Sequence, residues 1–300
     1  MLHIRRQELA LIAITVLWGA TFLIVHEAVR YSGPLFFVGV RFLTAGLIAV
    51  LVFRRALSGL NRRELIAGSA IGVSVFLGYG LQTIGLQSVS SSTSAFLTAL
   101  YVPIVPLLQW AVFRRAPRLA ALAGIGLAFA GLVLLAGPGA TGLTLNTGEV
   151  LTLISAVAIA AEILLIGHYA GRVHLGRVTV VQLLVAGALS LAAMPVAGES
   201  VPSFSWVWLT AAVGLGAASY VIQLVMNWAQ NSVSPTRAAV IYAGEPVWGG
   251  VFGRLAGDRL PPLAFVGAAL IVAGVIVSEL RPRDRPAPQS EPAIREESTV

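Results

Sequence analysis

The sequence of 300 residues contains no cysteine and no lysine, and only 11% of its residues are charged. Without cysteine the chain can form neither disulfides nor thiolate metal sites, and it has no cysteine nucleophile. Soluble domains carry about 25% charged residues, so the low charge excludes an ordinary soluble protein. What the chain has instead is apolar surface, because 57% of its residues are hydrophobic.

The apolar residues form long runs that can cross about 30 Å of hydrocarbon as helices. We count ten such spans: Leu9–Val29, Pro34–Phe53, Leu65–Leu86, Thr93–Phe113, Ala120–Ala136, Val150–Ala170, Val178–Val196, Trp206–Ala229, Ala238–Leu255 and Leu263–Leu280. The sequence therefore predicts an all-α integral membrane protein with ten transmembrane helices.

All twenty basic residues are arginine, and they fall in alternate loops. If the N-terminus lies inside, the inner loops hold most of them, from Arg5 and Arg6 to Arg281, whereas the outer loops hold only Arg30, Arg254 and Arg259. This pattern places both termini in the cytoplasm of a bacterial inner membrane protein. The net charge of +7 therefore comes from arginines in the inner loops of a membrane protein, and no nucleic-acid partner is predicted.

The second half of the sequence repeats the first. A shift of 143 positions aligns Pro103 with Pro246 and Gly131 with Gly274 without a gap. Five spans in each half require the two repeats to enter the membrane from opposite sides, which is an inverted repeat typical of transporters. We divide the chain into a first repeat (8–137), a loop between the repeats (138–148), a second repeat (149–280) and a disordered cytoplasmic tail (281–300).

Several short motifs resemble a known family: the run from Trp18 to Phe22, Arg41 with Phe42, Pro103, and Glu245 with Pro246 and Val247. They are similar to EamA-type members of the drug/metabolite transporter superfamily, over about residues 8 to 280. The resemblance implies a bundle of ten helices, built as two EamA repeats around a central cavity that serves alternating access. Members of the family include exporters of amino acids, among them aromatic ones, and permeases for other small metabolites.

Three ionisable residues lie deep inside predicted spans, where a charge costs roughly 2.5 to 3.5 kcal/mol. Glu245 is a candidate for binding a substrate amine or an exchangeable proton, or else a structural acid. Glu162 is either a second coupling residue or a structural hydrogen-bond partner. Arg41 binds a substrate carboxylate, or it pairs with one of the two glutamates.

Polar and aromatic residues also recur on one face of several spans, which predicts a partly wet cavity because lipid does not require such residues. Aromatic faces suit planar or cationic ligands, although the same residues can serve as core or interfacial packing. Pro103 and Pro246, at matched positions, are predicted hinges, and kinks unrelated to transport are the alternative. The candidate substrate-binding residues are Trp18, Thr21, Phe22, Arg41, Tyr79, Gln82, Thr98, Tyr101, Tyr220, Gln223, Tyr242 and Trp248.

These features predict a secondary transporter that exports small amphipathic metabolites, above all neutral or aromatic amino acids, with protons as a possible partner. An exporter of drugs or cationic compounds is the alternative. The four histidines show no metal-ligand spacing, and no phosphate-binding loop of the Walker type is present. We therefore expect no metal and no cofactor, and we expect no enzyme because no acid–base or nucleophile constellation is found.

Overall fold

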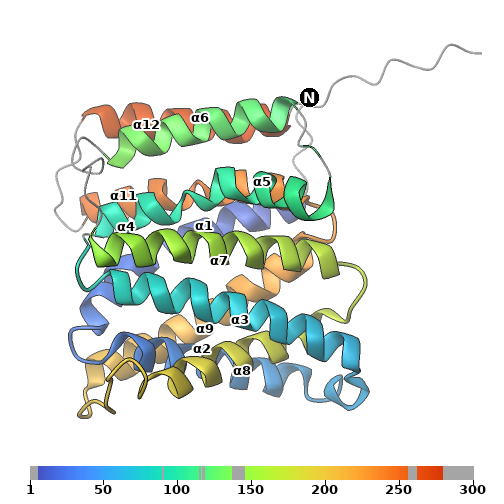
Figure 1. Cartoon of the computed structure of the whole chain (residues 1–300), viewed down its shortest axis with the longest axis vertical. Coiled ribbons are helices and arrows are strands. Elements are labelled where there is room, and N and C mark those ends of the chain that lie inside the picture. Colours follow the sequence, from blue (N-terminus) through green and yellow to red (C-terminus); the bar gives the residue numbers. More distant parts are fainter. Residues whose placement is uncertain are drawn as a thin grey trace, which may run out of the picture.

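The computed structural model describes residues 6–89, 91–114, 116, 119–136, 146–255 and 262–279. The described part is all-helical, and its helices run side by side in one bundle (Figure 1). The predicted tail and residues 138–145 of the predicted loop lie outside the described residues. The helices are α1 (Arg6–Ala28), α2 (Pro34–Phe53), a short 3-10 helix (Leu57–Gly59), α3 (Arg62–Gly85), α4 (Ser91–Thr98), α5 (Tyr101–Phe113), α6 (Leu119–Ala136), α7 (Thr147–Tyr169), α8 (Leu175–Ala193), α9 (Trp206–Ala229), α10 (Pro235–Tyr242), α11 (Glu245–Leu255) and α12 (Pro262–Glu279).

Six of these helices, α1, α2, α3, α7, α8 and α9, are each long and apolar enough to cross a membrane. The prediction that the fourth and ninth spans are continuous helices is wrong. Each span is divided into two helices, α4 with α5 and α10 with α11. The two breaks lie at equivalent places in the two repeats, just before Pro103 and Pro246. A proline has no N–H to donate to the carbonyl four residues earlier, so the helix loses a bond at each break. The Ala99 carbonyl accepts a bond from the Val102 N–H at 3.0 Å instead.

Helices α6 and α12 pack against each other along one edge of the bundle (Figure 1). Small residues let their backbones approach closely. A Cβ atom placed on Gly131 would lie 2.5 Å from the Gly267 carbonyl oxygen, and one placed on Gly274 would lie 2.6 Å from the Gly124 carbonyl oxygen. The pair thus has no room for side chains at these contacts.

Replacing Gly131 by valine should separate this pair and lower thermal stability, since backbone carbonyls cannot move aside as a flexible side chain can. We expect the melting temperature of the purified protein to fall by several degrees, in line with a loss of about 2 kcal/mol. Gly126→Val is the matched control, because a Cβ atom at Gly126 meets nothing within 4 Å. Equal melting temperatures for the two variants would contradict this account of the pair.

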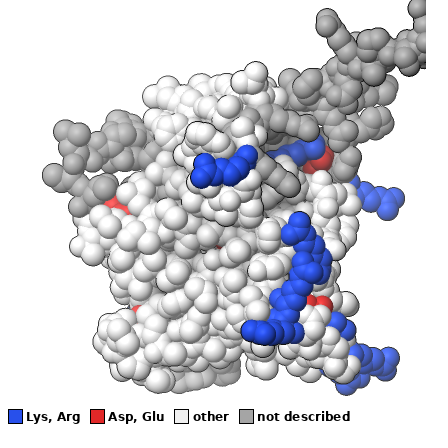
Figure 2. All heavy atoms as spheres, turned by 45° about the vertical axis from the view of Figure 1, so that its right-hand side comes forward, with Lys and Arg blue, Asp and Glu red and all other residues white. Residues whose placement is uncertain are grey.

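Ion pairs connect the two repeats at the end of the bundle where α2 passes into α3. Arg177 of α8 lies 3.2 Å from Glu64 of α3, and Arg237 of α10 lies 2.8 Å from Glu8 of α1. Both carboxylates are almost fully buried. Figure 2 shows arginine side chains gathered along this side of the molecule. It is the side that the arginine pattern predicts to face the cytoplasm.

Candidate functional site

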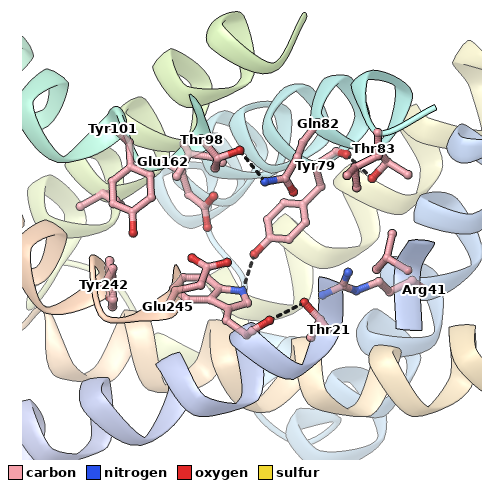
Figure 3. A pocket seen from close by; sticks show the side chains of 15 residues that line it. Thr21, Arg41, Tyr79, Gln82, Thr83, Thr98, Tyr101, Glu162, Tyr242 and Glu245 are labelled. Atoms are coloured by element: carbon pink, nitrogen blue, oxygen red, sulfur yellow. Dashed lines mark hydrogen bonds between the residues drawn. The ribbon is translucent and has the colours of Figure 1, made fainter. Parts of the chain in front are cut away.

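A cavity lies at the two helix breaks and draws its lining from both repeats (Figure 3). It is lined by Trp18, Thr21 and Val25 of α1, Arg41 of α2, Tyr79, Gln82 and Thr83 of α3 with the adjoining Leu86, Thr98 of α4, Tyr101 of α5, Ile159, Glu162 and Ile163 of α7, Tyr242 of α10 and Glu245 of α11. No described residue of the α6 and α12 pair lines it. Residues that lie far apart in the sequence therefore meet here because the breaks bring four helix ends to one place.

Most of the residues that the sequence predicted for the site are in this lining. They are Trp18, Thr21, Arg41, Tyr79, Gln82, Thr98, Tyr101, Glu162, Tyr242 and Glu245. Tyr220, Gln223 and Trp248 are not part of the lining, and the side chain of Phe22 lies outside the described part of the structure. Pro103 and Pro246 follow the breaks without lining the cavity, so their role as hinges stays a prediction.

Five lining residues were missed: Val25, Thr83, Leu86, Ile159 and Ile163. Most are apolar, and nothing in their residue type separates them from the core. Spacing was the available signal for four of them. Val25, Thr83 and Leu86 follow Thr21, Tyr79 and Gln82 by four positions, and Ile159 precedes Glu162 by three, so each shares a helix face with a predicted residue.

Aromatic side chains form a fixed frame around the cavity. The indole Nε1 of Trp18 donates a hydrogen bond of 2.9 Å to the Tyr79 hydroxyl, and the Trp18 ring meets the Tyr242 ring edge to face with centroids 5.2 Å apart. The ring of Phe42 packs edge to face on Tyr79 at 5.0 Å. Because each ring is held by another, the frame presents fixed apolar faces to the cavity.

Arg41 is buried at one end of the cavity, with 3% of its surface exposed. Its Nε donates to the Ser219 hydroxyl at 2.7 Å, and its guanidinium lies over the rings of Phe42 and Tyr79, at 5.5 and 5.3 Å from their centroids. No described carboxylate lies within 4 Å of it, so the ion pair that the sequence left open as an alternative is not formed. The guanidinium is therefore a buried positive charge beside the cavity.

The two carboxylates of the site lie on the other side of Tyr79 from Arg41 (Figure 3). Glu162 is 1% exposed, and its Oε1 accepts a hydrogen bond of 2.7 Å from Gln223 Nε2. Glu245 is the first residue of α11, where the helix dipole favours a negative charge. Both carboxylates turn toward the same central space in Figure 3. The cavity thus has one positive end and one negative end.

The cavity is narrow in this conformation, with a free volume of about 30 Å³. This is room for one or two water molecules, whereas ligand pockets usually measure about 300–1,000 Å³. Gln82 Nε2 donates to the Thr98 hydroxyl at 2.8 Å across the lining. The Tyr101 hydroxyl is buried and has no hydrogen-bond partner among the described residues. A bound polar group would give this hydroxyl a partner once the lining residues move apart.

Comparisons with known proteins agree with the fold and the repeats. The sequence pattern of the EamA-like transporter family matches residues 6–137 and 146–280. A protein of Archaeoglobus fulgidus named an uncharacterized transporter is 31% identical over 91% of this chain and 86% of its own length. The uncharacterized inner membrane transporter YedA of Escherichia coli K12 is 29% identical over 97% of this chain and 96% of its own. A crystal structure with 20% identity superposes with a TM-score of 0.77 and covers 91% of this chain and 95% of its own, which shows a shared fold.

Proposed function

Because the chain belongs to the EamA-like transporter family of multi-pass membrane proteins, we propose that it is a secondary transporter which exports zwitterionic metabolites, most of all neutral and aromatic amino acids, across the inner membrane. The observation that carries this proposal is the separation of charge in the cavity. Arg41 and the two glutamates face one space but do not pair with each other. A free amino acid carries the complementary pair of charges.

In this proposal the substrate lies with its carboxylate at Arg41 and its ammonium group at Glu245 and Glu162. The Nε of Arg41 is bonded to Ser219, which leaves the two terminal nitrogens for a bidentate carboxylate. The side chain of the substrate then packs on the rings of Tyr101 and Tyr242, and aromatic substrates gain most from these faces. The hydroxyl of Tyr101 supplies a further polar contact.

Transport proceeds by alternating access, in which the inverted repeats open the cavity to one side of the membrane and then to the other. The broken helices α4 with α5 and α10 with α11 are the elements that we propose to bend. Since the sequence has no Walker motif, an ion or substrate gradient drives the cycle. A carboxylate in the cavity that binds and releases a proton would couple transport to the proton gradient.

An exporter of drugs or cationic compounds remains the second candidate, because two carboxylates and several aromatic rings suit a cation. Arg41 argues against it, since a cation in this cavity would meet a buried guanidinium. The two candidates differ in their need for a substrate carboxylate.

The test is uptake of labelled phenylalanine, tryptophan, threonine and methionine into proteoliposomes, with and without an imposed pH gradient. Each amino acid is paired with its amide, which keeps the amine and lacks the carboxylate. Saturable uptake of the acids, with the amides at least tenfold weaker, would support the proposal. Preference for the amides and for quaternary amines would support the cation exporter. No uptake of either set by folded protein would overturn both.

Partly buried polar contacts connect the inner ends of α1, α5 and α10, and we propose that they close the cytoplasmic side. Besides the ion pair of Arg237 with Glu8, the Thr236 hydroxyl donates to Gln109 Oε1 at 2.9 Å. Replacing Arg237 by glutamine leaves the buried Glu8 without this cation, so the closed inner side should lose stability. The substitution Thr98→Cys introduces the only cysteine of the chain into the cavity lining. We expect this cysteine to react with a thiol reagent added on the inner side at least tenfold faster when Arg237→Gln is also present.

The matched control is Arg30→Gln. Arg30 also pairs with a glutamate at 3.0 Å, but this pair is exposed at the opposite end of α1 and contributes little. Labelling from the inside that rises equally in both variants would show a general loss of packing rather than the opening of one side.

A further inference from the structure

A chain of buried side-chain amides runs behind the cavity and ends on Glu162. Gln223 Nε2 donates to Glu162 Oε1 at 2.7 Å, Gln182 Nε2 donates to Gln223 Oε1 at 2.7 Å, and Asn227 Nδ2 donates to Gln182 Oε1 at 3.1 Å. All four side chains are buried, and they come from α7, α8 and α9. We call Gln223, Gln182 and Asn227 the amide chain.

The far end of the amide chain reaches the arginine-rich side of the bundle. Asn227 lines a second, smaller pocket together with Tyr169, Gly171 and Asn231, where α7 and α9 end and α8 begins. This pocket has a free volume of about 20 Å³, which is room for one water molecule. There the Asn227 Nδ2 also donates to the Thr179 hydroxyl at 3.2 Å and to the main-chain carbonyl of Gln223 at 2.9 Å.

The direction of the amide chain follows from the chemistry of its last member. An ionised carboxylate can only accept hydrogen bonds, so Gln223 must present its amide N–H to Glu162. The Gln223 oxygen then has to accept, and the same holds for Gln182 in turn. All three amide dipoles therefore point their positive ends toward Glu162, and bonds aligned in this way strengthen one another in a medium of low polarity. A neutral acid accepts such a bond less strongly, so the alignment favours the ionised form.

We propose that Gln223, Gln182 and Asn227 are positioning residues for Glu162, which keep its carboxylate ionised and turned to the cavity, and that Glu162 is the group whose protonation changes during transport. This inference rests on the proposed function for its second half. The proton comes from water or a substrate ammonium in the cavity and binds to a carboxylate oxygen of Glu162. It leaves to water when the cavity faces the other side.

Other charged and titratable side chains also face Glu162 across the cavity. They are Arg41, Tyr79, Tyr101, Tyr242 and Glu245, from α2, α3, α5, α10 and α11. Of these groups, Glu245 carries a charge of the same sign as an ionised Glu162 and Arg41 a charge of the opposite sign. A substitution in the amide chain alters none of these groups, so a change in the titration of Glu162 can be assigned to the lost bond.

The test is infrared titration of the protonated carboxyl band in reconstituted protein, which needs no transported substrate. The component that disappears in Glu162→Gln belongs to Glu162. In Gln223→Met, which nearly keeps the side-chain volume, we expect the midpoint of that component to rise by about one pH unit, a roughly tenfold gain in proton affinity. Gln182→Met should shift it in the same direction by less, since it acts through Gln223. If Gln223→Met does not fold, Gln182→Met carries the test.

The matched control is Gln230→Met, a buried amide at the end of α9 that has no bond to the amide chain. It loses only a 3.4 Å bond to the hydroxyl of the facing Tyr242, so it also measures how far a change at a facing group moves the midpoint. It should leave the midpoint unchanged. A merely structural role would lower stability in these variants without moving the midpoint, and an unchanged midpoint in both Gln223→Met and Gln182→Met would overturn the positioning role. A band that Glu162→Gln does not alter would overturn the choice of Glu162 as the proton-binding group.

The outcome is separable from that of the proposed function. A shifted midpoint in protein that transports none of the amino acids supports the positioning role and contradicts the proposed substrate. Uptake driven by a proton gradient, with an unshifted Glu162 midpoint in Gln223→Met and Gln182→Met, supports the proposed transporter and contradicts the positioning role of the amide chain.

Discussion

Replacing Arg41 by glutamine should reduce the uptake of phenylalanine into proteoliposomes by roughly 100-fold, which we expect as an increase in KM. The guanidinium is buried beside the cavity and has no described carboxylate within 4 Å, and among the described lining residues Arg41 is the one cation that a substrate carboxylate would meet. Losing one member of a buried, hydrogen-bonded charge pair costs about 2–5 kcal/mol. Phenylalanine amide, which has no carboxylate, should lose far less uptake or even gain.

Two further variants separate binding from packing. Ser219→Ala removes the hydroxyl that accepts the 2.7 Å bond from Arg41 Nε and leaves the guanidinium in place, so it should change uptake by less than tenfold. Arg41→Lys keeps the positive charge but loses the bidentate geometry and should fall between the wild type and Arg41→Gln. If phenylalanine and its amide lose uptake equally in Arg41→Gln, the residue is structural and does not bind a carboxylate.

The sequence predicted the membrane spans and most of the cavity lining because both follow from patterns within one helix. Tyr79 and Gln82, for example, lie three positions apart and so share a face whatever the tertiary structure. In the fourth and ninth spans the prolines were predicted as hinges, or else as kinks, within continuous helices, so the division of each span into two helices was not expected. Proline marks where a helix bond is lost, but whether the helix bends or divides depends on the packing around it.

The amide chain could not be read from the sequence, and its members show why. Gln182 is a single amide in the span Val178–Val196, and nothing on its own helix relates it to Glu162. Its partner Gln223 was predicted to bind substrate, since it shares a polar face with Tyr220 and Asn227. Only the packing of α7, α8 and α9 places these residues in one line behind the carboxylate. Contacts between helices that are distant in the chain carry no periodic signal.

The two cavity glutamates should respond differently to the same substitution, although both were candidates for coupling. Glu162 is almost fully buried and accepts a hydrogen bond from the amide chain. This bond stabilises the ionised carboxylate, as is needed in a group that stays charged between proton exchanges. Glu245 stands at the helix break where α11 begins, and it makes no ion pair with a described residue. That position leaves its carboxylate to a ligand. We therefore assign the substrate amine mainly to Glu245 and the proton mainly to Glu162.

On this assignment, Glu245→Gln should raise the KM for phenylalanine by about 30-fold or more while uptake keeps its response to an imposed pH gradient. Glu162→Gln should remove that response and leave only downhill exchange. The measurement is phenylalanine uptake against external pH, and phenylpropanoate, which lacks the amine, serves as a second substrate that Glu245→Gln should not weaken. Loss of the pH response in Glu245→Gln with its retention in Glu162→Gln would exchange the two roles. A loss in both variants would mean that the carboxylates share one proton, because two like charges in a narrow cavity of low polarity titrate as a pair rather than singly.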